Sequence, residues 1–145
     1  MPLVEHAVQL ASLDWCALLK NGRVRCWQAG HAAQTQMFYD LAEIVGDVKK
    51  NWTVREFPAL PPLVHFASGQ FHMCGATKEG SVFCWGGNTV GELGDGTDNE
   101  RAAPIQVQGL PSIKQLALLA GGTCALSTEG EVFCWGLRAP ERRKQ

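Results

Sequence analysis

The apolar positions of this chain recur in three short blocks that share one order of residues. In each block a cysteine is followed after six residues by glycine, after two more by valine, after two more by cysteine, and then directly by tryptophan. The blocks run over 16–27, 74–85 and 124–135 and contain every cysteine of the chain. Because the second cysteine lies beside β-branched or aromatic residues and the glycine follows a polar pair, each block predicts a β-hairpin.

The spacing of the blocks predicts a repeat protein. Cys74 follows Cys16 by 58 residues, and Cys124 follows Cys74 by 50. Periods of about 40–50 residues are typical of propeller blades, each of which is a four-stranded antiparallel sheet. We therefore expect an all-β chain that forms an incomplete propeller of about three blades, within residues 1–137. The predicted repeats are approximately 1–59, 60–109 and 110–137.

The turn of each predicted hairpin fixes which residues face each other. A three-residue loop whose last residue is left-handed favours glycine at that place, and Gly22, Gly80 and Gly130 occupy it. Counting outward from the first loop sets Cys16 opposite Cys26, and the same count pairs the other cysteines. Such pairs are non-hydrogen-bonded, with Cα atoms roughly 4.5 Å apart. That separation lies within reach of a disulfide, at its short end.

Six cysteines allow fifteen pairings, and the repeat geometry selects three cross-hairpin bridges. Reduced cysteines packed between the sheets are the alternative. Zinc is disfavoured, because no Cys-x-x-Cys pair exists and the four histidines share no period. Each bridge would contribute about 2–3 kcal/mol to stability by restricting the unfolded chain. The predicted disulfides are Cys16–Cys26, Cys74–Cys84 and Cys124–Cys134.

A longer string of residues surrounds the second block. It contains Ala67, Gly69 and His72 before the hairpin, Gly80 and Val82 in it, Trp85, Gly86 and Asn88 after it, and the run Gly91-Glu92-Leu93-Gly94-Asp95-Gly96. This string resembles the repeat of the regulator of chromosome condensation family, a family of seven-bladed propellers that also includes beta-lactamase-inhibitor protein II. The family has glutamine in that run where this chain has Glu92.

The resemblance implies structural roles for the residues of the blade motif. His72 could act as a general base, but it lies in the family's structural strand motif. The other two copies have Asp14 and Gly122 at its position, so we expect a structural histidine. The residues to which the motif gives structural roles are Gly22, Trp27, Gly69, His72, Gly80, Trp85, Gly86, Gly130, Trp135 and Gly136.

Charge and composition disfavour several classes of function. The chain has 13 basic and 14 acidic residues, a net charge of −1, so no basic field favours nucleic acid. No apolar stretch reaches the roughly eighteen residues needed to span a bilayer, and we expect no membrane partner. Paired cysteines favour an exported parent protein, whereas the lack of a recognisable signal peptide favours the cytoplasm. We expect no catalytic residues, no metal and no cofactor.

The class of function that remains is recognition of a partner through loops on a rigid sheet scaffold. We expect a non-enzymatic protein-binding or assembly module that uses the connection 87–103. The resemblance implies two alternatives, guanine-nucleotide exchange on a small GTPase and inhibition of an enzyme by a secreted protein. The candidate partner-binding residues are Asn88, Glu92, Asp95, Asp98, Asn99, Glu100 and Arg101.

The length of the chain constrains its assembly. Propellers close with about four to eight blades, and 145 residues supply about three. We therefore expect self-association, or a second chain, to complete the ring. The first inter-block connection carries an apolar pattern over 37–49 that fits a short helix, and an irregular packed loop fits it equally. Residues 138–145 form a basic C-terminal tail.

Overall fold

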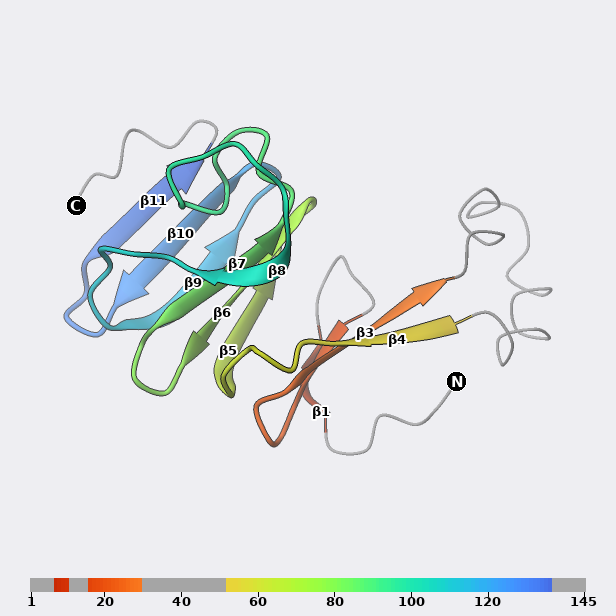
Figure 1. Cartoon of the computed structure of the whole chain (residues 1–145). Helices are drawn as coiled ribbons and strands as arrows, with labels where there is room; N and C mark the ends of the chain where they lie inside the picture. Colours follow the sequence, from red (N-terminus) through yellow and green to blue (C-terminus); the bar gives the residue numbers. More distant parts are fainter. Residues whose placement is uncertain (1–6, 11–15, 30–51, 137–145) are drawn as a thin grey trace.

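The computed structural model describes residues 7–10, 16–29 and 52–136. Within these residues the strands form three antiparallel sheets that follow one another along the chain (Figure 1). The first blade contains β1 (Ala7–Leu10), β2 (Cys16–Leu19), β3 (Val24–Ala29) and β4 (Trp52–Glu56). The second blade contains β5 (Leu63–Ser68), β6 (His72–Thr77), β7 (Val82–Gly86) and β8 (Arg101–Gln106). The third blade contains β9 (Ile113–Leu118), β10 (Gly122–Ser127) and β11 (Val132–Gly136).

The predicted all-β, incomplete propeller is confirmed. The first two blades have four strands each, and the third has three in the described part of the chain, in the order β11-β10-β9. The helix considered over 37–49 and the basic tail 138–145 lie outside the described residues. No helix long and apolar enough to cross a membrane occurs in the described ranges.

The hairpin register follows the count made from the turn glycines. In the first blade Leu18 lies opposite Val24, and the Leu19 N–H donates to the Arg23 carbonyl oxygen at 2.8 Å to close the turn. Each cysteine faces its predicted partner, and the three pairs form disulfides with Cα atoms 4.0, 4.1 and 4.1 Å apart. One turn geometry therefore builds the same bridged hairpin three times.

The apolar core lies between the blades. Each sheet alternates its side chains between two faces, so the second sheet packs on the first with one face and on the third with the other. The cluster between the first and second blades consists of Cys16, Leu18, Val24, Cys26, Phe57, Leu60, Leu63, Phe66 and Trp85. The cluster between the second and third blades consists of Cys74, Ala76, Val82, Cys84, Leu93, Val107, Ile113, Leu116, Ala125 and Trp135.

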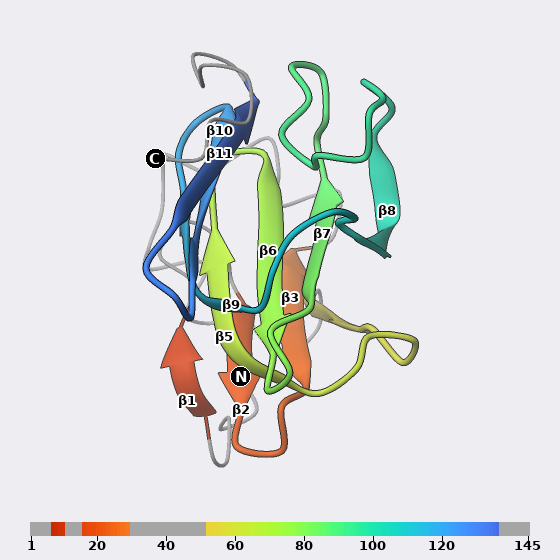
Figure 2. The ribbon, with the colours of Figure 1, turned by 90° about the vertical axis from the view of Figure 1, so that its left-hand side faces the viewer.

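The two ends of the blades carry different connections (Figure 2). The short β6–β7 and β10–β11 hairpins lie at the lower end in that view, and the long β7–β8 connection rises at the upper end together with the β5–β6 turn. The β7–β8 connection is about ten residues longer than the turns of the lower hairpins, because β7 ends at Gly86 and β8 begins only at Arg101. The upper end therefore holds most of the non-repetitive chain in the second blade.

Candidate functional site

The β7–β8 connection is organised around the buried side chain of Asn88. This residue has 0% of its surface exposed. Its Nδ2 donates to the Asp95 Oδ1 at 3.1 Å and to the carbonyl oxygens of Thr97 and Asn99 at 3.0 Å each, and its Oδ1 accepts from the Leu93 N–H at 2.9 Å. One amide thus ties both halves of the connection together, and the loop is held in one shape.

Asp95 is the second centre of the connection. Its Oδ1 accepts from the Thr97 N–H at 2.9 Å and the Thr97 hydroxyl at 2.8 Å, and its Oδ2 accepts from the Arg101 Nε at 3.1 Å. Burial raises the pKa of Asp95, but the hydrogen bonds from Thr97, Asn88 and Arg101 outweigh this and lower the pKa from 3.8 to about 2. Asp95 is therefore ionised throughout the physiological range and fixes the loop as a carboxylate.

The base of the connection is joined to the third blade through Glu92. The Glu92 carbonyl oxygen accepts from the Thr123 hydroxyl and from the Trp135 Nε1, both at 2.8 Å. The His72 Nε2 lies 2.7 Å from the Thr123 Oγ1. All four residues are at most 5% exposed. This buried junction couples the second blade, its upper connection and the third blade in one network.

The junction fixes the tautomer of His72. The single hydroxyl hydrogen of Thr123 is donated to Glu92, so its oxygen must accept from a protonated Nε2 of His72. Nδ1 then carries the lone pair, and it has no hydrogen-bond partner in the described part of the chain. Burial lowers the pKa of His72 below its ordinary value of 6.5, against a smaller raising effect of Glu92. His72 is thus neutral at neutral pH.

Stability is expected to fall as the pH drops below 6.5, because the unfolded histidine then binds a proton that the folded His72 binds only at lower pH. Urea unfolding of the oxidised chain at a series of pH values measures this slope. The variant His72→Gln keeps a donor for Thr123 but does not titrate, so its slope in this range should be shallower. Equal slopes for the two proteins would refute a lowered pKa for His72.

The outward side of the upper connection is polar and acidic. Asp98, Asn99 and Glu100 are exposed. Apolar side chains lie on neighbouring segments at the same end: Phe71 is 59% exposed, Val90 37% and Leu119 67%. The Gly87 N–H donates to the Phe71 carbonyl at 2.7 Å, and a Cβ at Gly69 would lie 2.7 Å from the Leu119 carbonyl oxygen, so these segments touch. We call Phe71, Val90, Asp98, Asn99, Glu100 and Leu119 the loop surface.

Two family profiles match the second and third blades. Both describe the regulator of chromosome condensation (RCC1) repeat, one over residues 63–92 and the other over residues 79–126. Residues 63–126 of this chain are RCC1 repeats. The solved RCC1-family structures share the fold: the yeast RCC1 protein Prp20, in a crystal structure with Kap60, is 27% identical, with a TM-score of 0.66 over 90% of this chain and 30% of its own.

Other RCC1 relatives are much longer than this chain. The human probable E3 ubiquitin-protein ligase HERC6 is 31% identical over 107 residues, which make up 73% of this chain and 10% of HERC6. A second structure of Prp20p from Saccharomyces cerevisiae, studied for its binding properties to Gsp1p and histones, is 24% identical, with a TM-score of 0.67 over 90% of this chain and 31% of its own. This chain therefore spans about a tenth of HERC6 and about a third of the solved propellers.

The structure corrects two of the proposed partner-binding residues. Asn88 is 0% exposed and Glu92 is 1% exposed, so neither side chain is available at the surface. The Glu92 carboxylate instead accepts from the Val90 N–H at 2.9 Å, inside the connection. Asp95 and Arg101 are half-buried and paired with each other at 3.1 Å. Asp98, Asn99 and Glu100 are the candidates that reach solvent.

The RCC1 motif residues lie at turns, strand ends and blade contacts. His72 and Trp135 belong to the buried junction, and Trp85 lies in the core between the first two blades. Trp27 lies in β3, and its side chain is outside the described atoms. The motif glycines occupy the β2–β3, β6–β7 and β10–β11 turns, the start of the β5–β6 turn, and the ends of β7 and β11. They are Gly22, Gly80, Gly130, Gly69, Gly86 and Gly136.

Sequence reasoning missed Thr123, Phe71 and Leu119. Thr123 completes the buried junction, but a single threonine between a glycine and a cysteine carries no signal for a contact with a histidine 51 residues earlier. Phe71 and Leu119 lie in turns next to strands whose apolar residues are buried, so their exposure could not be read from the apolar pattern. The order of residues in the third copy shows only that Gly122 replaces the family histidine.

Proposed function

We propose that this chain is a non-enzymatic protein-binding module of the RCC1 repeat type, and that its contact surface is the loop surface. The observation that carries the proposal is a connection fixed by internal hydrogen bonds, which presents exposed carboxylates at the end of the blades where apolar side chains are also exposed. Asn88 and Asp95 fix the connection from inside, so Asp98 and Glu100 are presented without a large ordering cost. Arg101 stays in its pair with Asp95 at the border of the surface.

The composition of the loop surface indicates the chemistry of its partner. Exposed apolar residues such as Phe71 and Leu119 form the anchor type of contact that is enriched at protein interfaces. The carboxylates of Asp98 and Glu100 at the same end of the blades (Figure 2) favour a partner with basic side chains around an apolar contact. In the described residues no group of three or more His, Cys, Asp or Glu side chains could hold a metal, and the one buried histidine is 1% exposed.

The exchange-factor and inhibitor alternatives depend on a full propeller. The chain spans 30% and 31% of two solved yeast RCC1 chains, so the loops of the remaining blades would have to come from elsewhere. The loop surface lies on the second and third blades, both of which this chain contains. A local protein-binding role is therefore better supported than either alternative.

Reversing the charge of the loop surface is expected to weaken partner binding at least about 10-fold, since rim and hot-spot charges control association with a complementary partner. The variant is Asp98→Lys with Glu100→Lys. A photo-crosslinking residue at position 99 first traps the partner, and the affinity of that purified partner is then measured for both proteins. The reduction should shrink at high salt because the interaction is between exposed charges.

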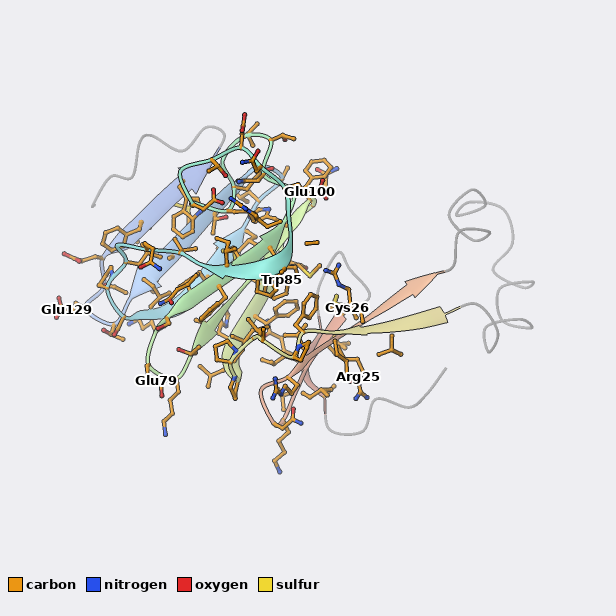
Figure 3. All side chains as sticks on the ribbon, in the orientation of Figure 1. Arg25, Cys26, Glu79, Trp85, Glu100 and Glu129 are labelled. Carbon is orange, nitrogen blue, oxygen red and sulfur yellow. A yellow bond between two sulfur atoms is a disulfide. The ribbon has the colours of Figure 1, made fainter. Side chains whose placement is uncertain are left out.

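A matched control changes the same number of charges at the opposite end. Glu79 and Glu129 are exposed in the lower hairpins, far from Glu100 (Figure 3). Glu79→Lys with Glu129→Lys has the same net charge as the loop variant and should bind within about two-fold of the unchanged chain. Crosslinking of the same partner from position 79 as strong as from position 99, or an equal loss in both variants, would rule out the loop surface as the contact.

A further inference from the structure

Each blade has one face built around its disulfide, and the first and second blades turn this face toward the blade that follows. This disulfide face consists of Cys16, Leu18, Val24 and Cys26 in the first blade, Cys74, Ala76, Val82 and Cys84 in the second, and Cys124, Leu126, Val132 and Cys134 in the third. It is buried in the first two blades, where its residues are at most 8% and at most 1% exposed, respectively. The third blade therefore has the same face as the other two.

Two backbone hydrogen bonds mark how a disulfide face is covered. The Leu63 N–H, at the start of the second blade, donates to the Gly22 carbonyl oxygen at 2.8 Å. The Ile113 N–H, at the start of the third blade, donates to the Gly80 carbonyl oxygen at 3.0 Å. The first residue of each following blade is thus bonded to the hairpin glycine of the blade before it.

A side chain of each first strand makes a second recurring contact. The Gln9 Nε2 in β1 donates to the Phe66 carbonyl oxygen in β5. The His65 Nε2 in β5 lies 3.2 Å from the Leu116 carbonyl oxygen in β9. Gln9 and His65 occupy the same register position, and the apolar side chains of the residues that they reach are 0% and 4% exposed against the disulfide face.

The same two contact points of the third blade have no counterpart in the described part of the chain. No described atom lies within 4 Å of a Cβ placed at Gly130, whereas Gly22 and Gly80 meet the following blade at 2.7 Å and 2.6 Å. Gln115 occupies the register position of Gln9 and His65 and is exposed. The four residues of the third disulfide face are half-buried where their equivalents are covered.

The first blade offers the complementary surface. Ala7 holds in β1 the register position that Leu63 holds in β5, and Leu10 holds that of Phe66. Leu10 is 73% exposed, while Phe66 is 0% exposed. Because Gln9 points toward the second blade and side chains alternate along a strand, Leu10 points away from it. The third blade thus carries an uncovered disulfide face, which we call the acceptor face. The first blade carries Leu10, the uncovered equivalent of Phe66, whose side chain covers the disulfide face of the first blade.

We propose that the disulfide face of the third blade binds the first blade of a second copy of this chain. In this arrangement the Ala7 N–H donates to the Gly130 carbonyl, Gln115 donates to the Leu10 carbonyl, and Leu10 packs on the third disulfide face. The interface joins two different surfaces, so it is heterologous and extends the propeller from copy to copy. Two copies supply six blades, which is within the range in which propellers close.

Sedimentation velocity of the full, unreduced chain over about 1–200 µM tests the proposal. The unchanged chain should associate with rising concentration. Val132→Lys places a charge in the acceptor face, and Leu10→Lys places one on the complementary strand. Each should weaken association more than about 100-fold, because a lysine would be buried without a partner. Val64→Lys is the matched control, since Val64 is 62% exposed on the inner blade and its substitution should leave association unchanged.

Mixing the two variants gives the decisive result. Val132→Lys keeps an intact Leu10, and Leu10→Lys keeps an intact acceptor face, so each alone should be monomeric and the mixture should form a one-to-one dimer. An isologous interface, in which one surface meets the same surface of the second copy, would not recover on mixing and would overturn the proposal. So would a chain that stays monomeric at all concentrations, or variants that associate as the unchanged chain does.

A second, conservative variant guards against a misfolded lysine variant. Gln115→Glu has the same shape, but its carboxylate would face the Leu10 carbonyl, so association should weaken at least about 10-fold. Cys124 and Cys134 provide an independent readout: at low concentration their disulfide should be reduced and alkylated before the buried Cys74–Cys84 disulfide, and association should protect it. Equal protection at all concentrations would contradict the proposed interface. The loop surface takes no part, so Asp98→Lys with Glu100→Lys should associate normally.

Discussion

Replacing Trp85 by alanine is expected to lower the free energy of unfolding by about 3–5 kcal/mol, as truncations of large buried aromatic side chains do. Trp85 is 1% exposed. Its ring centroid lies 4.9 Å from that of Phe57 and 6.1 Å from that of Phe66. The side chain comes from the second blade and packs on the first, so the cavity would open where two blades meet. Urea unfolding of the oxidised chain at dilute concentration measures the loss.

Two further variants identify the source of that loss. Trp85→Phe removes an indole N–H that has no hydrogen-bond partner in the described part of the chain, so only volume is lost and about 1–2 kcal/mol is expected. Phe71→Ala truncates an aromatic residue that is 59% exposed and should change stability by less than about 0.5 kcal/mol. If Trp85→Ala were no more destabilised than Phe71→Ala, the contact between the blades would not hold the fold together.

The hairpins could be predicted because a single local rule controls them. A glycine in the left-handed region closes the turn, and every residue of both strands then follows by counting outward from it. Cys16 and Cys26 meet for this reason alone, and the two later copies repeat the result. The blade count follows from the same repetition. Local turn chemistry and period 2 alternation need no information from distant parts of the chain.

The candidate site could be predicted only in part, because its burial depends on contacts between blades. Asn88 and Glu92 are polar residues in a glycine-rich connection, which usually indicates solvent exposure. They are buried because Asn88 binds the connection from inside and the Glu92 carbonyl accepts from Thr123 and Trp135 of the next blade. These partners are 31 and 43 residues from Glu92, and nothing in the local sequence of either segment specifies the other.

Features that repeat in every blade depend on local sequence, whereas features that occur once depend on one contact between blades. The disulfide and the hairpin glycine occur in all three copies, so the hairpin register in one blade predicts the register in the next. His72 occurs once, because the other copies have Asp14 and Gly122 at its position. The buried junction is therefore specific to the contact between the second and third blades, and its pH dependence should be a property of that contact alone.

Gly80→Ala is expected to destabilise the chain by about 2–5 kcal/mol, which combines a backbone strain with a clash between blades. Gly80 has a φ of 88°, where an L side chain costs roughly 1–2 kcal/mol. A Cβ there would lie 2.6 Å from the Ile113 nitrogen and 2.6 Å from the Ser112 Cα, so backbone must move, at a cost of about 1–3 kcal/mol. Urea unfolding at dilute concentration measures the sum.

Gly130→Ala separates the two costs. Gly130 has a φ of 90°, nearly that of Gly80, but no described atom lies within 4 Å of its Cβ position. Its loss at dilute concentration should be the strain alone, about 1–2 kcal/mol. Equal losses in the free energy of unfolding would mean that backbone strain in the turn accounts for both, and that the contact between the blades adjusts to the added methyl group at little cost. A larger loss at Gly80 would show that the close contact between its hairpin and the first strand of the next blade fixes how consecutive blades pack.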